Sequence, residues 1–194
     1  SINGNGTDTG TYDISSGTGL VFGGGTRTLN TGFAMTGLGT LRISAGTVNI
    51  GQNIALGSQT TLELAGGTLG GSGNLTVTGQ FMITGTSTLT GTGVLTTQGA
   101  TTVDDGTTGS AFALTLNGKN WVNEGTLTVS GNDCITTSGV ASALSNMPTG
   151  TIFLNSSHSA PINYTNAPMT LNNQGTLVQA AAGTHAISAN ITVN

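Results

Sequence analysis

The chain has 194 residues, of which only 5% are charged, and its formal net charge is −4, whereas a typical soluble domain carries about 25% charged residues. Its three cationic side chains, Arg27, Arg42 and Lys119, do not cluster, which argues against nucleic acid as a partner and against a polybasic membrane-surface site. No apolar run approaches the ~20 residues of a membrane helix, so we expect no membrane insertion of this segment.

Apolar residues recur with a step of about 20 residues from the N-terminal part of the chain onwards. The first column is Leu20, Leu41, Leu62 and Met82, and the second is Phe22, Ile43 and Leu64. Two further columns are Tyr12, Phe33, Ile54, Leu75, Leu95 and Leu114, and Ile14, Met35, Leu56, Val77, Thr97 and Leu116. Such self-similarity at a fixed period is typical of repeat architectures.

Gly-Thr pairs lie between these columns, and the apolar residues within each repeat alternate. The pairs are Gly25-Thr26, Gly46-Thr47, Gly67-Thr68, Gly106-Thr107 and Gly125-Thr126, with Ser87-Thr88 in the remaining place. Alternation with a period of two predicts short strands with one inward face, and the glycine clusters predict bends between them. Each repeat therefore holds about three strands and three bends.

The resulting prediction is an all-β fold, a parallel β-helix (β-solenoid) whose turns stack on one another. The coil should be right-handed, as crossovers between parallel strands are. We expect one solenoid segment over residues 1–194, with regular turns of about 20 residues over 1–118 and longer turns of about 25 residues with loops over 119–194. Neither end shows the polar cap that an isolated array needs, which predicts a fragment of a longer protein continued by further solenoid turns.

The longer spacing is seen in the last third of the chain. Gly-Thr pairs recur there at 25-residue intervals, at Gly125-Thr126, Gly150-Thr151 and Gly175-Thr176. The stretch 156–168 contains two of the three prolines and is the best loop candidate, while 138–147 is expected to form a short helical turn. Cys134 lies beside Ile135 and is interpreted as a small buried hydrophobe.

Several stretches resemble a known group of proteins. "GSGNLTVTG", "QFMITGTSTLTGTGVLTTQGATTV", "VNEGTLTVSG" and "LNNQGTL" are similar to the repeats of large bacterial surface β-helix proteins, the filamentous-haemagglutinin-like adhesins and autotransporter-type passengers. The resemblance implies an extracellular or cell-surface rod that serves in adhesion or as a stalk, with glycans or host and neighbouring-cell surfaces as partners. The resemblance transfers no catalytic residue, and we expect no enzyme activity and no cofactor.

The alternative from another class is a carbohydrate-active β-helix enzyme, a polysaccharide lyase or hydrolase. Asp104-Asp105 is the only adjacent carboxylate pair, and hydrolysis needs two carboxylates facing one substrate gap. Neighbouring residues of a strand point to opposite faces, so this pair is interpreted as a polar bend before Gly106. The histidines and Cys134 show no metal-binding spacing, and no metal site is expected.

A lesser alternative is an ice-binding solenoid, which needs a flat array of Thr-x-Thr motifs. Thr76 and Thr78 fit locally, but one period later they correspond to Thr96 and Gln98, so this array does not persist.

Aromatic and histidine side chains give the remaining candidates for binding. Trp121 is assigned to the inward column of Leu62 and Met82, with core packing as its main role. His158 and Tyr164, in the proline-containing loop, are the weak candidates for a binding site.

Overall fold

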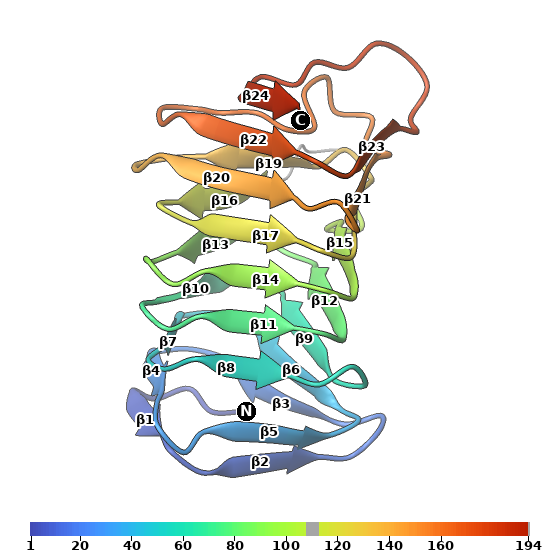
Figure 1. Ribbon diagram of the computed structural model, residues 1–194. Coiled ribbons are helices and arrows are strands. Elements are labelled where there is room, and N and C mark those ends of the chain that lie inside the picture. The colour runs from blue at the N-terminus through green and yellow to red at the C-terminus, as the bar shows by residue number, and fades with distance from the viewer. Residues whose placement is uncertain (108–112, 194) are drawn as a thin grey trace.

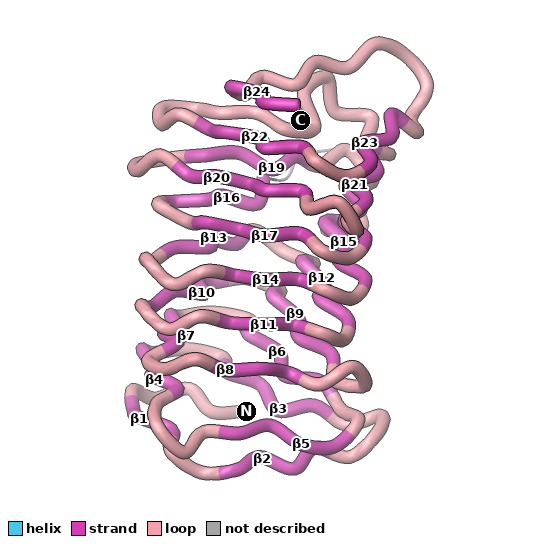
Figure 2. Tube along the Cα trace, viewed as in Figure 1, coloured by secondary structure: helices cyan, strands magenta, loops and turns pink. Residues whose placement is uncertain are grey.

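The computed structural model describes residues 1–107 and 113–193. The described chain forms 24 strands and no helix, and the strands stack into a parallel β-solenoid with about 21 residues per turn. In Figure 1 the chain runs from left to right along the near strands, returns behind them and climbs towards the C-terminus, so the coil is right-handed. Figure 2 shows short strands separated by bends in every turn. The predicted fold class is confirmed.

Three parallel sheets make the walls of the coil, and a separate strand pair lies at its N-terminal end. Sheet 1 comprises β1 (Gly6–Asp8), β4 (Thr26–Leu29), β7 (Thr47–Ile50), β10 (Gly67–Gly71), β13 (Ser87–Thr90), β16 (Ala113–Asn117) and β19 (Cys134–Thr137). Sheet 2 comprises β8 (Ile54–Leu56), β11 (Leu75–Val77), β14 (Leu95–Thr97), β17 (Asn120–Asn123), β20 (Ser142–Asn146), β22 (Met169–Asn173) and β24 (Asn190–Val193). Sheet 3 comprises β3 (Gly19–Phe22), β6 (Thr40–Ile43), β9 (Thr61–Leu64), β12 (Gln80–Ile83), β15 (Ala100–Val103), β18 (Thr126–Val129), β21 (Thr151–Leu154) and β23 (Thr176–Gln179).

The separate pair, β2 (Thr11–Ile14) and β5 (Ala34–Gly37), forms a two-stranded parallel sheet. Among the described strands, no ladder joins β5 to β8, although β8 occupies the same place in the next turn. The carbonyl of Phe33 instead accepts a 3.4 Å hydrogen bond from the side chain of Gln52. The first two turns are therefore attached to the rest through sheets 1 and 3.

The bends depend on glycine where successive turns touch. Gly46 has a φ of 74°, which is a left-handed conformation that side chains disfavour. A Cβ atom at Gly46 would also collide with the carbonyl oxygen of Gly25 in the turn below. The glycine of each Gly-Thr pair at this bend therefore allows the chain to turn and the next turn to lie directly on it.

Several predicted columns are confirmed by the strand register. Leu41 pairs with Leu62, and Ile43 with Leu64, while Leu75 pairs with both Ile54 and Leu95. These side chains are buried and form one continuous hydrophobic core along the axis. Burial of such aliphatic surface is the main stabilising contribution to the coil.

Other column assignments were wrong, either because the residue pairs at a different register or because it belongs to a different sheet. Leu62 pairs with Phe81, so Met82 lies beside Glu63 on the outer face. Leu95 pairs with Trp121, so the aromatic side chain belongs to sheet 2 and not to the column of Leu62. Tyr12 pairs with Met35 and not with Phe33. Leu114 and Leu116 belong to sheet 1, where they pair with Ser87 and Leu89. The pair Gly125-Thr126 belongs to sheet 3, where Thr126 pairs with Ala100.

Two assignments in the last third also change. The stretch 138–147 contains strand β20 and not a helical turn, because Leu144 alternates with outward residues and packs between Trp121 and Leu171. The predicted loop 156–168 is irregular, but Ile162 within it is fully buried and bridges Ile135 and Ile187. Sheet 1 therefore continues through this stretch as single bridges.

The outward face of sheet 1 carries a column of threonines that crosses six turns. Their Cα positions pair in sequence, and the column is Thr26, Thr47, Thr68, Thr88, Thr115 and Thr136. On sheet 2, Thr76 pairs with Thr96, and Thr78 donates a 3.1 Å hydrogen bond to Gln98. The Thr-x-Thr array therefore breaks on sheet 2, as expected. Sheet 1 holds a longer column, of which the Gly-Thr spacing predicted Thr26 to Thr88 but not Thr115 and Thr136.

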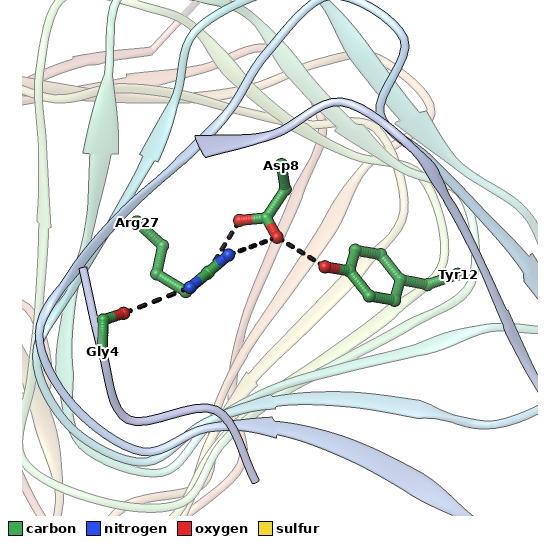
Figure 3. A network of polar contacts seen from close by, with 4 residues as sticks. All are labelled: Gly4, Asp8, Tyr12 and Arg27. Atoms are coloured by element: carbon green, nitrogen blue, oxygen red, sulfur yellow. Dashed lines mark hydrogen bonds and ion pairs between the residues drawn. The ribbon is translucent and has the colours of Figure 1, made fainter. Parts of the chain in front are cut away.

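Figure 3 shows a polar network inside the N-terminal end of the coil. The Arg27 guanidinium donates 2.8 and 2.6 Å hydrogen bonds to the two carboxylate oxygens of Asp8, and Tyr12 donates a third. Asp8 continues the inward column of Leu29, and Arg27 that of Val48. Paired charges therefore take the place of aliphatic side chains at these two inward positions.

Sheet 2 contains a buried ladder of three asparagines. The Asn123 amide nitrogen donates a 2.8 Å hydrogen bond to the Asn146 side-chain oxygen, and Asn146 donates an equal one to Asn173. Asn123 also donates to the Thr151 carbonyl, and Asn146 to the Thr176 carbonyl. The ladder thus links three successive turns and also contacts the carbonyls at the start of strands β21 and β23.

Candidate functional site

A pocket of about 310 Å³ opens at the bend between Ile162 and strand β22. Its lining comes from this bend and from the following turn, and consists of Tyr164, Asn166, Ala167, Pro168, Met169 and Asn190. Ala167 and Met169 are buried and form an apolar floor, whereas the Tyr164 side chain is 53% exposed. The pocket therefore combines an aromatic wall, an apolar floor and amide groups.

Hydrogen bonds to the turn below hold this bend in place. The backbone N–H of Thr165 donates to the Thr137 carbonyl at 3.1 Å, and the Thr137 hydroxyl donates to the Ala167 carbonyl. The Asn166 side-chain oxygen accepts a 2.9 Å hydrogen bond from the backbone N–H of Gly139. The backbone around Tyr164 is consequently fixed while its ring is left exposed.

His158, the other predicted binding residue, lies outside this pocket lining. Its Nδ1 atom accepts a hydrogen bond from the backbone N–H of Ala160 at 3.0 Å, within its own turn. The carbonyl of His158 contacts Nδ1 of His185 at 2.7 Å. Hydrogen bonds to the Ala182 and His158 carbonyls raise the pKa of His185. The structure therefore does not bring His158 and Tyr164 together; Tyr164 instead lies with Asn166 and Asn190.

Asp104, Asp105 and Asp133 bring their carboxylate oxygens within 4.8 Å of one another. Sequence reasoning singled out the first two but missed Asp133, because it belongs to the next turn. Each carboxylate already shapes a bend: Asp104 accepts from the Gly106 N–H, Asp105 from the Thr107 N–H, and Asp133 from the Asp105 N–H. Oxygen clusters of this kind suit hard cations such as Ca²⁺, and this is the one such acidic group among the described residues.

Lys119 is 3% exposed and its ammonium group lies inside a bend. The ammonium donates hydrogen bonds to the Gly93 carbonyl at 2.7 Å and to the Thr90 carbonyl at 3.3 Å. Burial lowers the pKa of Lys119 to about 8. With Arg27 also turned inward, two of the three cations on the chain are withdrawn from the surface.

Cys134 is buried in strand β19, as its interpretation as a small hydrophobe requires. Burial and the neighbouring charge of Asp133 raise the pKa of its thiol to about 11. Since the thiolate is the reactive species, this cysteine is a packing residue in the folded chain.

Comparisons with known proteins return no match: no family model, no curated protein and no solved structure is significantly similar to this chain. The part of the chain that the structure describes contains no helix long and apolar enough to cross a membrane. Function is therefore argued from the fold and from the sites above.

Proposed function

We propose that the chain is a structural or adhesive segment of a secreted or cell-surface protein, acting as a rigid stalk or display scaffold. The observation that carries this proposal is the continuity of sheet 3, in which eight parallel strands lie one above another. At a spacing of about 4.8 Å between strands, this stack rises by roughly 35 Å. The surface-protein repeats that the sequence resembles support the same role.

The interior of the coil explains why such a segment would be stiff. Each internal turn forms backbone hydrogen bonds with the turns below and above it through the sheets, and the hydrophobic core is continuous along the axis. Bending the coil would break ladder hydrogen bonds on one wall and open gaps in a close-packed interior. A segment built in this way holds whatever it displays at a fixed distance.

A surface-display experiment tests this role. The chain is placed between an outer-membrane anchor and a fluorescent tag, and the distance from tag to membrane is measured by energy transfer to a membrane dye. The proposal expects a narrow distance distribution. A Gly/Ser linker of equal residue number serves as the control and should give a broad distribution. Equal widths for the two inserts would contradict the scaffold role.

The native location is tested separately. Antibodies raised against the purified chain should label intact source cells, and external protease should remove that labelling without lysis. Labelling that appears only after lysis would contradict surface exposure.

A second candidate function, ice binding, is favoured by the threonine column of sheet 1. Hydroxyl and methyl groups repeat there at the strand spacing over the five turns from Thr26 to Thr115, with Thr68 at the middle, while Thr136 is buried against Thr165. Thermal hysteresis measured at micromolar protein should then be present and should be lost in Thr68→Tyr. The same change at Thr76, on the outward face of sheet 2, is the control and should leave hysteresis unchanged. Absence of hysteresis in the unmodified chain would exclude this function.

A further inference from the structure

We propose that the pocket at Tyr164 binds one ring of a neutral saccharide. This site goes beyond the scaffold role, because a rigid stalk can act without a ligand pocket. Sugar binding in turn does not depend on the length of the coil. The proposal rests on three features of the lining, namely an exposed aromatic ring, amide groups from two successive turns, and the absence of ionisable groups other than the tyrosine hydroxyl.

The aromatic ring provides the stacking surface. Tyr164 is one of three large hydrophobic side chains exposed among the described residues, and the only aromatic one. The face of an aromatic ring carries partial negative charge, and the C–H groups on one face of a pyranose carry partial positive charge. Buried Met169 and Ala167 add an apolar floor beside the ring, so an apolar sugar face would be removed from water on two sides.

The amides provide the polar contacts. The Asn166 side-chain oxygen is fixed by the Gly139 N–H, and its Nδ2 group has no hydrogen-bond partner among the described residues. Asn190 is exposed, lies one turn further along, and pairs its backbone with Thr170. An asparagine amide offers two donors and an acceptor, which matches the paired donor and acceptor character of neighbouring sugar hydroxyls.

The charge and the size of the pocket select the class of ligand. No Lys, Arg, Asp or Glu side chain lines it, so an acidic sugar would lose hydration without gaining an ion pair. The volume of about 310 Å³ lies at the small end of ligand pockets and suits one ring of a longer glycan whose other units extend into solvent.

The test uses the methyl glycosides of glucose, galactose, mannose and N-acetylglucosamine as probes. Saturation-transfer difference spectra should show contact with at least one of them, and a titration followed by ¹⁵N–¹H spectra should shift the amide signals of Tyr164, Asn166 and Asn190. Tyr164→Ala should weaken binding by about tenfold, which corresponds to ~1.4 kcal/mol, because the aromatic stacking surface is lost. Tyr164→Phe retains the ring and should retain binding.

Controls separate this site from general effects on the fold. Leu38→Ala removes a side chain of similar exposure (52%) elsewhere on the coil and should leave binding unchanged. Circular dichroism melting curves should match for all variants. No binding of any probe, binding that survives Tyr164→Ala, or stronger binding of methyl N-acetylneuraminic acid would overturn the proposal, and none of these results would affect the scaffold role.

Discussion

One inward column of sheet 2 is built in two different chemistries along the same coil. In the regular N-terminal turns the position is filled by Leu56 and Val77, and in the longer turns by Asn123, Asn146 and Asn173. All five side chains are buried. The aliphatic pair needs only close packing, whereas each amide needs a partner, and the partner is the same residue of the neighbouring turn.

The difference teaches how a solenoid can bury polar groups. A lone buried amide costs free energy, but a stack of identical amides satisfies itself from turn to turn and also reaches the carbonyls of adjacent bends. Thr97 joins the two halves of the column: its hydroxyl accepts from the Trp121 indole at 3.0 Å and donates to the Asn123 oxygen at 3.3 Å. The polar ladder therefore begins at a residue that can pair in both directions.

The largest effect is expected at the centre of the ladder. Asn146→Ala should lower the free energy of unfolding by about 4 kcal/mol, because it removes the donor to the buried Asn173 oxygen and the acceptor of the buried Asn123 amide. Urea unfolding followed by circular dichroism measures this. The outward neighbour Asn172, which bonds only to the Ser145 hydroxyl at 3.3 Å, is the control. Asn172→Ala should cost under ~1 kcal/mol, and equal costs for the two variants would contradict the ladder.

The charged pair at the N-terminal end should show the next largest effect. Arg27→Val leaves the buried Asp8 carboxylate with the Tyr12 hydroxyl but without its cationic partner, and should cost about 3 kcal/mol. The double variant Asp8→Leu/Arg27→Val extends the aliphatic columns of Leu29 and Val48 and should recover most of that loss. If the double variant did not regain stability, the charged pair would be more stabilising here than the aliphatic pair that replaces it.

The pH dependence of unfolding in the same variants tests whether ionised Asp8 stabilises the folded chain. Burial raises the pKa of Asp8, but hydrogen bonds from Arg27 and Tyr12 and the charge of Arg27 outweigh it, so the pKa lies below its ordinary 3.8. Its contribution to stability is thus complete above that value and is lost as pH falls through the lower folded pKa. The deficit of Arg27→Val should therefore shrink in acid.

Lys119 is expected to give a smaller, pH-dependent effect. Its pKa is about 8 in the folded chain against 10.5 ordinarily, so the unfolded chain binds more protons between these values and stability should rise with pH there. The gain from pH 7 to pH 10 should be about 2 kcal/mol. Lys119→Met should lack it. Parallel pH profiles of the two proteins in urea unfolding would contradict the assignment.

The smallest effect distinguishes two buried threonines. Thr101 Oγ1 is the one buried side-chain polar atom among the described residues with no hydrogen-bond partner, although it sits in the apolar column of Phe81 and Leu127. Thr101→Val should raise the free energy of unfolding by about 1 kcal/mol. Thr97→Val removes a paired hydroxyl and should lower it by a similar amount. A loss in both variants would contradict the distinction.

The sequence predicted the coil because the repeat is visible wherever turns keep one length. Leu41, Leu62 and Leu75 were placed correctly by spacing and alternation alone. The prediction became wrong where a bend gains or loses residues. Leu114 follows Leu95 by nearly one regular step, yet the true partner is Trp121, because residues inserted after Val103 displace the register of the following turn.

The candidate site could be predicted only in part. Tyr164 stood out as an aromatic residue in a loop with prolines, and this marked the bend that carries the pocket. Asn166 and Asn190 could not be distinguished from the many other asparagines, because their meeting depends on how two successive turns stack. His158 was grouped with Tyr164 by proximity in sequence, but its hydrogen bond to Ala160 directs it into a local turn.

Because no ladder joins β5 to β8, we expect the coil to unfold as two cooperative units. In a linear array, stability passes between neighbours through their shared interface, and here that interface has two hydrogen-bonded walls in place of three. The first two turns should open as a block before the remainder melts. A pulling force applied at the N-terminus should therefore unfold this block first and leave the longer unit folded. The weaker interface would then limit the force that reaches the longer unit.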